Sequence, residues 1–179
     1  MIEKEEHAII LDSLPYGYPL EKKMMPIAQA IGSKNFVLLE LVPRRGVRLE
    51  LNDQVYIGEG KRDKVYYILG RLQTDKLTET AKQQLEEFVE KQITGDEQKF
   101  VDFFNKAEAI NTRLHQFELL PGFGRKHTEA ILNERKKKLF ESLDELKKRV
   151  SNLPAPRKAI EKRIIQEITG RERYSLFTR

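Results

Sequence analysis

The spacing of apolar residues changes once along this chain, and that change most limits how it can fold. Between residues 35 and 72 apolar residues alternate with polar ones, which is typical of half-buried β-strands. Between residues 77 and 93 they recur every three or four residues, so one face of a helix is apolar. A chain of 179 residues is long enough for two small domains. The pattern therefore predicts an α+β protein in which a sheet precedes the helices.

The first part of the chain favours several short strands. We expect them at residues 8–11, 36–42, 47–51, 55–57 and 65–69, with the third and fourth forming a hairpin. Residues 24–31 favour neither a strand nor a helix. Closely spaced short strands joined by glycine-containing turns predict a small antiparallel β-barrel over residues 1–75.

Residues 76–110 are expected to form a helical connector between two domains. Its first helix should end at Thr94 and Gly95, and Asp96 can cap a second helix. The stretch 73–110 holds 9 acidic and 5 basic side chains, so we interpret it as packing material and not as an anion-binding surface.

Charge is unevenly distributed along the chain. The net charge is +5, but residues 1–110 carry −3 and residues 111–179 carry +8, from 17 basic and 9 acidic side chains. This excess predicts a polyanion as partner of the C-terminal part. The absence of cysteine excludes disulfides and thiolate metal sites, and no apolar run approaches the roughly 20 residues of a membrane helix. A cytoplasmic location without membrane contact is expected.

The segment 114–131 is the most informative motif. Leu114, Phe117 and Leu120 share one face of an expected helix, which two glycines and a proline in residues 120–124 then interrupt. A new helix is expected to begin near Arg125. Backbone amides at glycines and at the start of a helix are open to an anion, and the helix dipole favours negative charge there. The pattern predicts a phosphate-binding site.

This segment resembles the helix-hairpin-helix motif, which binds nucleic-acid backbones without reading sequence. The resemblance implies phosphate contacts at the backbone amides of Gly122, Gly124, Lys126 and His127. From their position at the start of the helix, the side chains of Arg125 and Lys126 are expected to add charge-assisted contacts. It also implies a monovalent cation at the carbonyls of Leu120 and Phe123. Thr128 stands where the motif usually has alanine, which would loosen the packing of the two helices. The alternative is that residues 120–124 only connect two helices.

A second, degenerate copy of this motif is expected at the C-terminal end, within a helix-hairpin-helix domain over residues 111–179. Ser142 and Glu145 form a capping box, and a helix should run to Val150. Residues 152–156 repeat the hairpin position without glycine, and a last helix follows. Further candidate contacts to nucleic acid here are Arg135, Lys136, Lys137, Lys138, Arg157 and Lys158.

The barrel offers a second candidate surface. Residues 51–58 resemble the strand-turn-strand element of oligonucleotide-binding or ribosomal-S1-like barrels. The candidate contacts are Arg44, Arg45, Lys61, Arg62, Lys64 and Tyr66, near which Tyr56 and Tyr67 also lie. Such tyrosines can stack on unpaired bases, or they can belong to the core or its rim.

As a whole, the chain resembles an archaeal family of unknown function, domain-of-unknown-function family 655. The residues that carry this resemblance are the barrel segment, the hairpin 120–124, the basic run 134–138 and the closing residues 173–177. It implies an oligonucleotide-binding-like barrel, a helix-hairpin-helix domain, a cytoplasmic location and RNA binding, with a link to ribosomal RNA or translation. No catalytic activity comes with it.

Enzymatic function has one specific alternative. DNA glycosylases place a catalytic aspartate some twenty residues after a similar hairpin, and Asp144 lies at about that distance, but its capping-box position already explains it. His7, His115 and His127 have no partners at metal-ligand or triad spacing. We therefore expect non-catalytic binding of structured or ribosomal RNA, with the ribosome or a protein as further partner and with no cofactor and no small-molecule substrate. The alternatives are a DNA-binding protein of repair or replication and a protein-binding scaffold.

Overall fold

The computed structural model describes residues 4–178 and confirms an α+β protein. The chain forms two compact units. The sheet unit comprises the described residues of 1–87 and 168–179, and the helical unit comprises residues 88–167. These bounds differ from the expected division at residues 75 and 110, because the connector is no separate body: its first helix crosses from one unit into the other.

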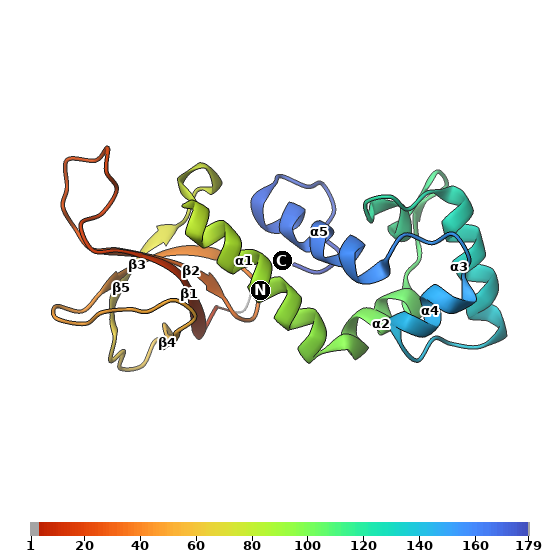
Figure 1. Ribbon diagram of the computed structural model, residues 1–179, viewed down its shortest axis with the longest axis horizontal. Coiled ribbons are helices and arrows are strands. Elements are labelled where there is room, and N and C mark those ends of the chain that lie inside the picture. Colours follow the sequence, from red (N-terminus) through yellow and green to blue (C-terminus); the bar gives the residue numbers. More distant parts are fainter. Residues whose placement is uncertain (1–3, 179) are drawn as a thin grey trace. The chain divides into compact units, whose positions relative to one another are not determined.

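The sheet unit is built on five antiparallel strands that curl into a half-barrel (Figure 1, red to yellow). Their order is β4-β1-β2-β3-β5. The strands are β1 (His7–Leu14), β2 (Ile27–Gly32), β3 (Leu38–Pro43), β4 (Gln54–Tyr56) and β5 (Val65–Arg71). A short 3-10 helix, η1 (Thr74–Lys76), follows β5 and leads into α1 (Glu79–Gly95).

The central strand β2 is buried on both faces. Ala28 and Ala30 face a core that also contains Ile10, Leu41 and Val65. On the other face, Gln29 is fully buried: its amide nitrogen donates to the carbonyl of Lys76 at 2.7 Å, and its amide oxygen accepts from the backbone amide of Thr78 at 3.1 Å. One glutamine thus fixes the start of α1 against the sheet.

Strand positions were predicted well except for β2, which the sequence did not reveal, and at residues 47–51. These residues form a loop, and β4 pairs with β1 instead of forming the expected hairpin. The loop is closed by Asp53, whose carboxylate accepts from the amide of Glu50 at 3.0 Å and whose carbonyl accepts from Ile10 at 2.9 Å. Leu49 is buried from this loop, which explains the strand-like alternation. The undecided residues 24–31 contain most of β2.

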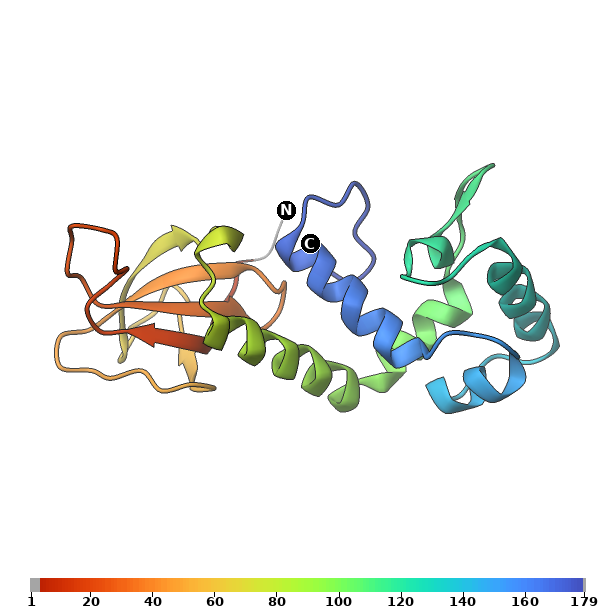
Figure 2. The same ribbon diagram turned by 45° about the horizontal axis from the view of Figure 1, so that its top comes forward.

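The helical unit contains the end of α1 and all but the end of α5 (Figure 2, green to blue). Its elements are α2 (Glu97–Lys106), the two-stranded β6 (Ala109–Asn111) and β7 (Leu114–His115), the 3-10 helix η2 (Gln116–Leu119), α3 (Arg125–Lys137), α4 (Leu143–Arg149) and α5 (Pro156–Thr169). None of the helices in the described chain is long and apolar enough to cross a membrane.

Aromatic rings form the core of the helical unit. Phe104 stacks on Phe117 with ring centroids 5.5 Å apart, and Phe123 approaches Phe104 at 6.2 Å. All three side chains are buried. Residues 120–124 connect η2 to α3. Because Phe117 precedes this segment and Phe123 lies near its end, the two rings anchor the segment in the core on both sides.

Two local predictions in this unit were wrong. The expected helix over residues 114–120 is a short strand followed by η2, since a spacing of three residues also suits a 3-10 helix. Asp96 precedes α2, but its side chain makes no capping hydrogen bond.

Candidate nucleic-acid interface

The first hairpin, residues 120–124, has the backbone of a tight turn. The carbonyl of Leu120 accepts from the amide of Phe123 at 3.0 Å. Pro121 and Gly122 occupy the middle of the turn, and Gly122 has φ +84°, as a type II turn requires. The Leu120 carbonyl keeps a second lone pair, so its use in the turn is compatible with the cation that the motif implies.

The start of α3 has fewer open amides than the sequence indicated. The amide of Gly124 was predicted to donate to phosphate, but in the structure it donates to Nδ1 of His127 at 3.0 Å. Because Nδ1 accepts, Nε2 carries the proton and donates to the carbonyl of Asn152 at 3.1 Å. The side chain of His127 therefore links the first hairpin to Asn152 in the second. The backbone amides of Arg125, Lys126 and His127 lie in the first turn of α3, where no intrahelical acceptor exists.

Thr128 contributes to the same turn. Its hydroxyl donates to the carbonyl of Gly124 at 3.0 Å, and its backbone amide donates to that carbonyl at 3.1 Å. The side chain is buried. Threonine in place of alanine thus adds a hydrogen bond at the start of α3, where we expected looser packing.

The side chains of Arg125 and Lys126 are exposed beside these amides. Neither has a carboxylate partner among residues 4–178. They therefore add positive charge where the helix dipole already favours an anion.

The second hairpin was predicted at residues 152–156, and in the structure residues 150–155 connect α4 to α5. It leads into α5 in a similar way. The carbonyl of Ala155 accepts from the amide of Ala159 at 3.1 Å, as that of Gly124 does from Thr128. Asn152 has φ +59°, and Pro156 brings no amide hydrogen to the first turn of α5. The ammonium of Lys147 donates to the carbonyl of Leu153.

The two predicted contacts on α5 are engaged within the protein. Arg157 pairs with Glu97 at 3.1 Å and also donates to the hydroxyl of Thr94 at 3.2 Å. Lys158 pairs with Glu161 at 3.2 Å and lies 3.8 Å from Glu90. Their charges are offset by acidic neighbours, unlike those at the first hairpin.

The basic run at the end of α3 separates into different roles. Arg135 donates to the carbonyls of Phe104 and Ala107 at 3.2 and 2.9 Å, so it closes the end of α2. Lys137 pairs with Glu134 at 2.9 Å and Lys138 with Glu141 at 3.3 Å. Within the described chain, only Lys136 of this run is exposed without an ion pair.

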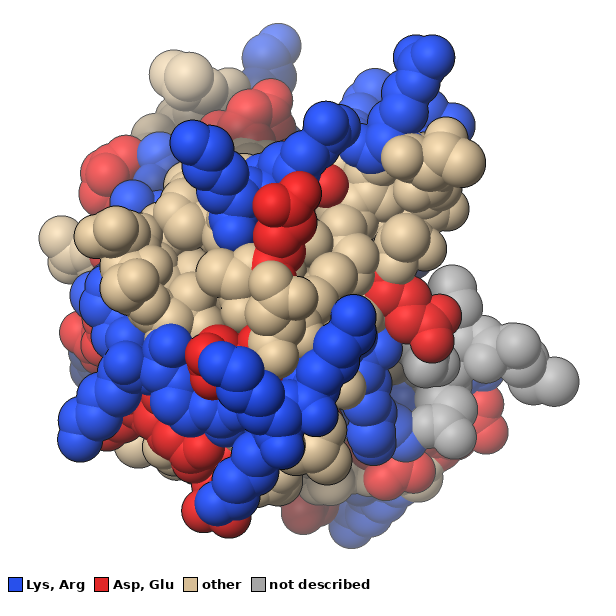
Figure 3. Space-filling view, turned by 90° about the vertical axis from the view of Figure 1, so that its right-hand side faces the viewer, with Lys and Arg blue, Asp and Glu red and all other residues tan. Residues whose placement is uncertain are grey.

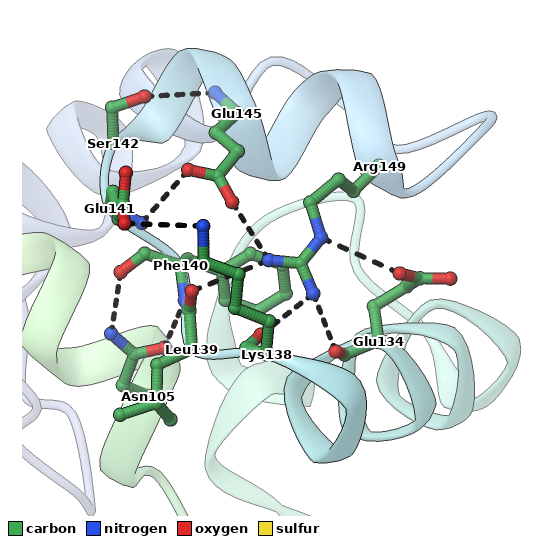
Figure 4. Close-up of polar contacts among 9 residues, drawn as sticks. All are labelled: Asn105, Glu134, Lys138, Leu139, Phe140, Glu141, Ser142, Glu145 and Arg149. Carbon is green, nitrogen blue, oxygen red and sulfur yellow. Dashed lines mark hydrogen bonds and ion pairs between the residues drawn. The ribbon is translucent and has the colours of Figure 1, made fainter.

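Arg149 is a structural residue that the sequence did not reveal (Figure 4). Its guanidinium donates to the carbonyls of Glu134 and Lys138 at 2.6 and 2.7 Å, and it pairs with Glu145 at 2.8 Å. It also lies over the ring of Phe140, 4.5 Å from the centroid. Arg149 thus joins the last turn of α3 to α4.

The expected capping box at α4 is half formed. The hydroxyl of Ser142 accepts from the amide of Glu145 at 3.0 Å, as predicted. The Glu145 carboxylate, however, accepts from the amide of Glu141 at 3.2 Å and from Arg149, whose hydrogen bond lowers the pKa of Glu145. Hydrogen bonding from Lys137 likewise lowers the pKa of Glu134.

Lys and Arg cover more of the surface than Asp and Glu at the end of the helical unit that α3 and α4 form (Figure 3). The exposed basic residues of these two helices are Arg125, Lys126, Lys136, Lys137, Lys147 and Lys148. This end of the helical unit is the face on which a polyanion would find positive charge.

The sheet unit brings three of its six candidate contacts together. Arg44, Arg45 and Tyr66 line one pocket. Arg62 instead donates to the carbonyl of Gly58 at 2.8 Å, and Lys64 lies 4.0 Å from Asp53. Lys61 is exposed outside the pocket.

The tyrosines near these basic residues have different roles. Tyr56 is half-buried, and its hydroxyl accepts from the amide of Gly60 at 3.0 Å, so it stabilises a turn. Tyr66 and Tyr67 are exposed. The sequence could not separate these roles, because all three tyrosines stand in strand-like stretches close to basic residues.

The residues considered for catalysis or metal binding remain apart. Asp144 is exposed in the first turn of α4. His115 caps η2, where its Nδ1 accepts from the amide of Phe117 at 3.1 Å, and burial lowers the pKa of its imidazole. No group of His, Asp and Glu residues suited to a metal ion occurs in the part of the chain that the structure describes.

These features define an α+β protein with a curled antiparallel sheet and a helical unit of two linked hairpins. The chain belongs to the family described as "Protein of unknown function (DUF655)", whose model matches residues 4–179. It is 40% identical over 177 residues to the uncharacterized protein MJ0038 of Methanocaldococcus jannaschii, a match that covers 98% of this chain and 80% of that protein. The crystal structure of Af1531 from Archaeoglobus fulgidus matches with a TM-score of 0.85 and 46% identity, covering 98% of this chain and 100% of that chain. The resemblance to an archaeal family of unknown function is thereby confirmed.

Proposed function

We propose that this protein binds nucleic acid in the cytoplasm without catalysis, and that its ligand is structured RNA, such as ribosomal RNA. The first hairpin and α3 act as a helix-hairpin-helix motif on the phosphate backbone. The curled sheet acts as an oligonucleotide-binding-like barrel that adds basic and aromatic contacts.

The start of α3 carries this proposal. Open first-turn amides, the positive end of the helix dipole and the side chains of Arg125 and Lys126, which have no ion pair within residues 4–178, converge there. We assign the phosphate contacts to the amides of Gly122, Lys126 and His127, because that of Gly124 is occupied by His127. A backbone contact of this kind holds the duplex but carries no sequence information.

Binding measured across a salt series tests the proposal. Fluorescence anisotropy would compare a structured RNA hairpin with a duplex DNA of equal length. Each phosphate contact adds about 0.9 to the slope of log K against log salt, so Arg125→Gln with Lys126→Gln should reduce the slope by about 2. Gly122→Val should weaken binding at every salt concentration, because valine disfavours the positive φ of the turn.

A matched control removes the same charge elsewhere in the helical unit. Lys91→Gln with Lys106→Gln neutralises two exposed lysines on α1 and α2 and should leave the slope nearly unchanged. Equal effects of the two double variants would contradict a site at the first hairpin. Tighter binding of the DNA duplex would replace RNA with DNA as the ligand. Binding of neither, with a salt-insensitive protein partner, would favour the scaffold.

A further inference from the structure

The sheet unit has a pocket of about 390 Å³ between the end of β3 and the start of β5. Its lining includes Pro26, Pro43, Arg44, Arg45, Gly46 and Tyr66. No carboxylate lines it. The tyrosine offers a flat aromatic ring and the two prolines add apolar surface, while the two arginines offer positive charge. This combination suits a ligand that is both planar and anionic.

Tyr66 is held in place but not used by the core. Its side chain is 63% exposed. Its ring meets that of Tyr67 edge to face with centroids 5.3 Å apart, and the Tyr67 hydroxyl donates to the sulfur of Met25 at 3.5 Å. An exposed ring that is fixed by its neighbour gives a stacking surface at a low entropic cost.

Two arginines that line the same pocket as Tyr66 can supply the positive charge for a phosphate. Nε of Arg44 donates to the carbonyl of Arg62 at 2.6 Å, which fixes the guanidinium, and its Nη groups have no partner among residues 4–178. Arg45 is exposed, and no ion pair engages it in the described chain. The nearby acids Glu50 and Asp53 face Arg48 at 3.4 Å and Lys64 at 4.0 Å.

The geometry points to a binding site for one unpaired nucleotide of an RNA strand, with its base on Tyr66 and its phosphate at Arg44 and Arg45. This inference rests on the proposed function and names which part of the ligand the sheet unit takes. A base within a duplex is already stacked on both faces and cannot enter the pocket, so the site selects loops, bulges or single-stranded ends. The helical unit would then hold the backbone of the paired region.

Tyr66→Ala tests the stacking contact on a fluorescein-labelled single-stranded RNA hexanucleotide. Loss of one stacked base weakens such complexes by about 5- to 160-fold, so the Kd should rise by a factor in that range. Tyr66→Phe should restore most of the affinity, because the ring is kept. The matched control is Tyr16→Ala, since Tyr16 is 74% exposed and lies outside the pocket, and its Kd should stay within about twofold of the wild type.

Arg45→Gln tests the phosphate contact. Competition by a free nucleotide shows whether the pocket binds an RNA strand or a mononucleotide. The variant should lower the salt slope for the single-stranded hexanucleotide by about 0.7. Competition by adenosine monophosphate at concentrations close to the Kd of the hexanucleotide would contradict an RNA strand as the ligand. Competition only at far higher concentrations supports it.

A blunt RNA duplex makes failure of this inference distinguishable from failure of the proposed function. Tyr66→Ala should leave duplex binding unchanged, whereas Arg125→Gln with Lys126→Gln should weaken it and spare the hexanucleotide. Hexanucleotide binding by Tyr66→Ala at wild-type affinity would overturn the nucleotide pocket alone. Duplex binding unaffected by the hairpin variant would overturn the phosphate site of the helical unit alone.

Discussion

The two hairpins of the helical unit reach similar shapes with different chemistry. Each holds one residue with positive φ, Gly122 at +84° or Asn152 at +59°, and each ends at a residue whose carbonyl accepts the first helical hydrogen bond. At the first hairpin the basic side chains face solvent without acidic partners in the described chain. At the second, Arg157 and Lys158 are paired with Glu97 and Glu161. The two turns therefore share a backbone conformation and differ in whether the cations beside them are already neutralised.

The largest expected effect is on RNA affinity, and it should distinguish the basic pair at the first hairpin from the basic pair at the second. Arg125→Gln with Lys126→Gln should weaken RNA binding by about 60-fold at 0.1 M salt, which follows from two lost counterion-releasing contacts. Arg157→Gln with Lys158→Gln should change the Kd by less than about threefold, since these charges are already offset. Anisotropy with one RNA at fixed salt measures both. Equal losses would show that the hairpins act alike.

The next effect is on stability and concerns Arg149, on the helix that enters the second hairpin. Arg149→Ala removes charge-assisted bonds to the carbonyls of Glu134 and Lys138 and the pair with Glu145, and should destabilise the helical unit by about 2 kcal/mol. Thermal unfolding followed by circular dichroism measures this. Lys148→Ala is the matched control, because Lys148 is exposed and has no ion pair among the described residues. An Arg149→Ala variant as stable as the control would rule out this role.

A smaller effect concerns the backbone of the first hairpin. Gly122→Ala should cost about 1–2 kcal/mol, because an L-residue at this φ is strained. The added Cβ would also lie 3.4 Å from Cγ of Pro154. Gly124→Ala should cost less, since its φ of −122° suits any residue and nothing lies within 4 Å of the added Cβ. Urea unfolding of both variants gives the comparison, and a reversed order would contradict the turn geometry.

The smallest effect is a pH dependence that only the first hairpin should show. His115 caps the 3-10 helix before it, whereas Ser142 caps the helix before the second hairpin. Burial, with the charge of Arg135, lowers the pKa of His115 in the folded state. His115 therefore binds a proton more readily in the unfolded chain than in the folded one. Its contribution to folding stability is fully present above the ordinary pKa of 6.5 and is lost as the pH falls through the lower pKa of the folded state.

Urea unfolding between pH 7.5 and 5 measures that dependence. His115→Asn keeps a side-chain acceptor for the amide of Phe117 but does not titrate, so its stability should vary less with pH than that of the wild type. Parallel pH profiles of stability for the two proteins would show that His115 does not cause the loss of stability at low pH.

Sequence patterns predicted the elements better than their partners. Alternation located β3 and β5, and the spacing of three and four residues located α1, because these patterns follow from which face is buried. The loop at residues 47–51 was mistaken for a strand, since Leu49 is buried without being in a sheet. Burial can be predicted from such a pattern, whereas pairing depends on distant residues such as Ile10 and Asp53.

The candidate site shows the same limit. Residues 120–124 were predicted to form a hairpin, because proline and glycine act through their own backbone. The roles of Arg135, Arg149 and His127 could not be predicted, since each contacts carbonyls or amides far along the chain or across a turn. Counting basic residues located the charge but not which cations lack an acidic partner in the described part of the chain.

The division of the chain between the units determines how the protein can be dissected. The sheet unit takes its residues from both ends of the sequence, and Thr74 donates to the carbonyl of Thr169 at 3.1 Å within it. A single proteolytic cut inside the helical unit therefore leaves two fragments that each keep a piece of the sheet unit. The helical unit is one continuous segment, residues 88–167, whereas an isolated sheet unit requires excision of that segment and a designed linker between residues 87 and 168.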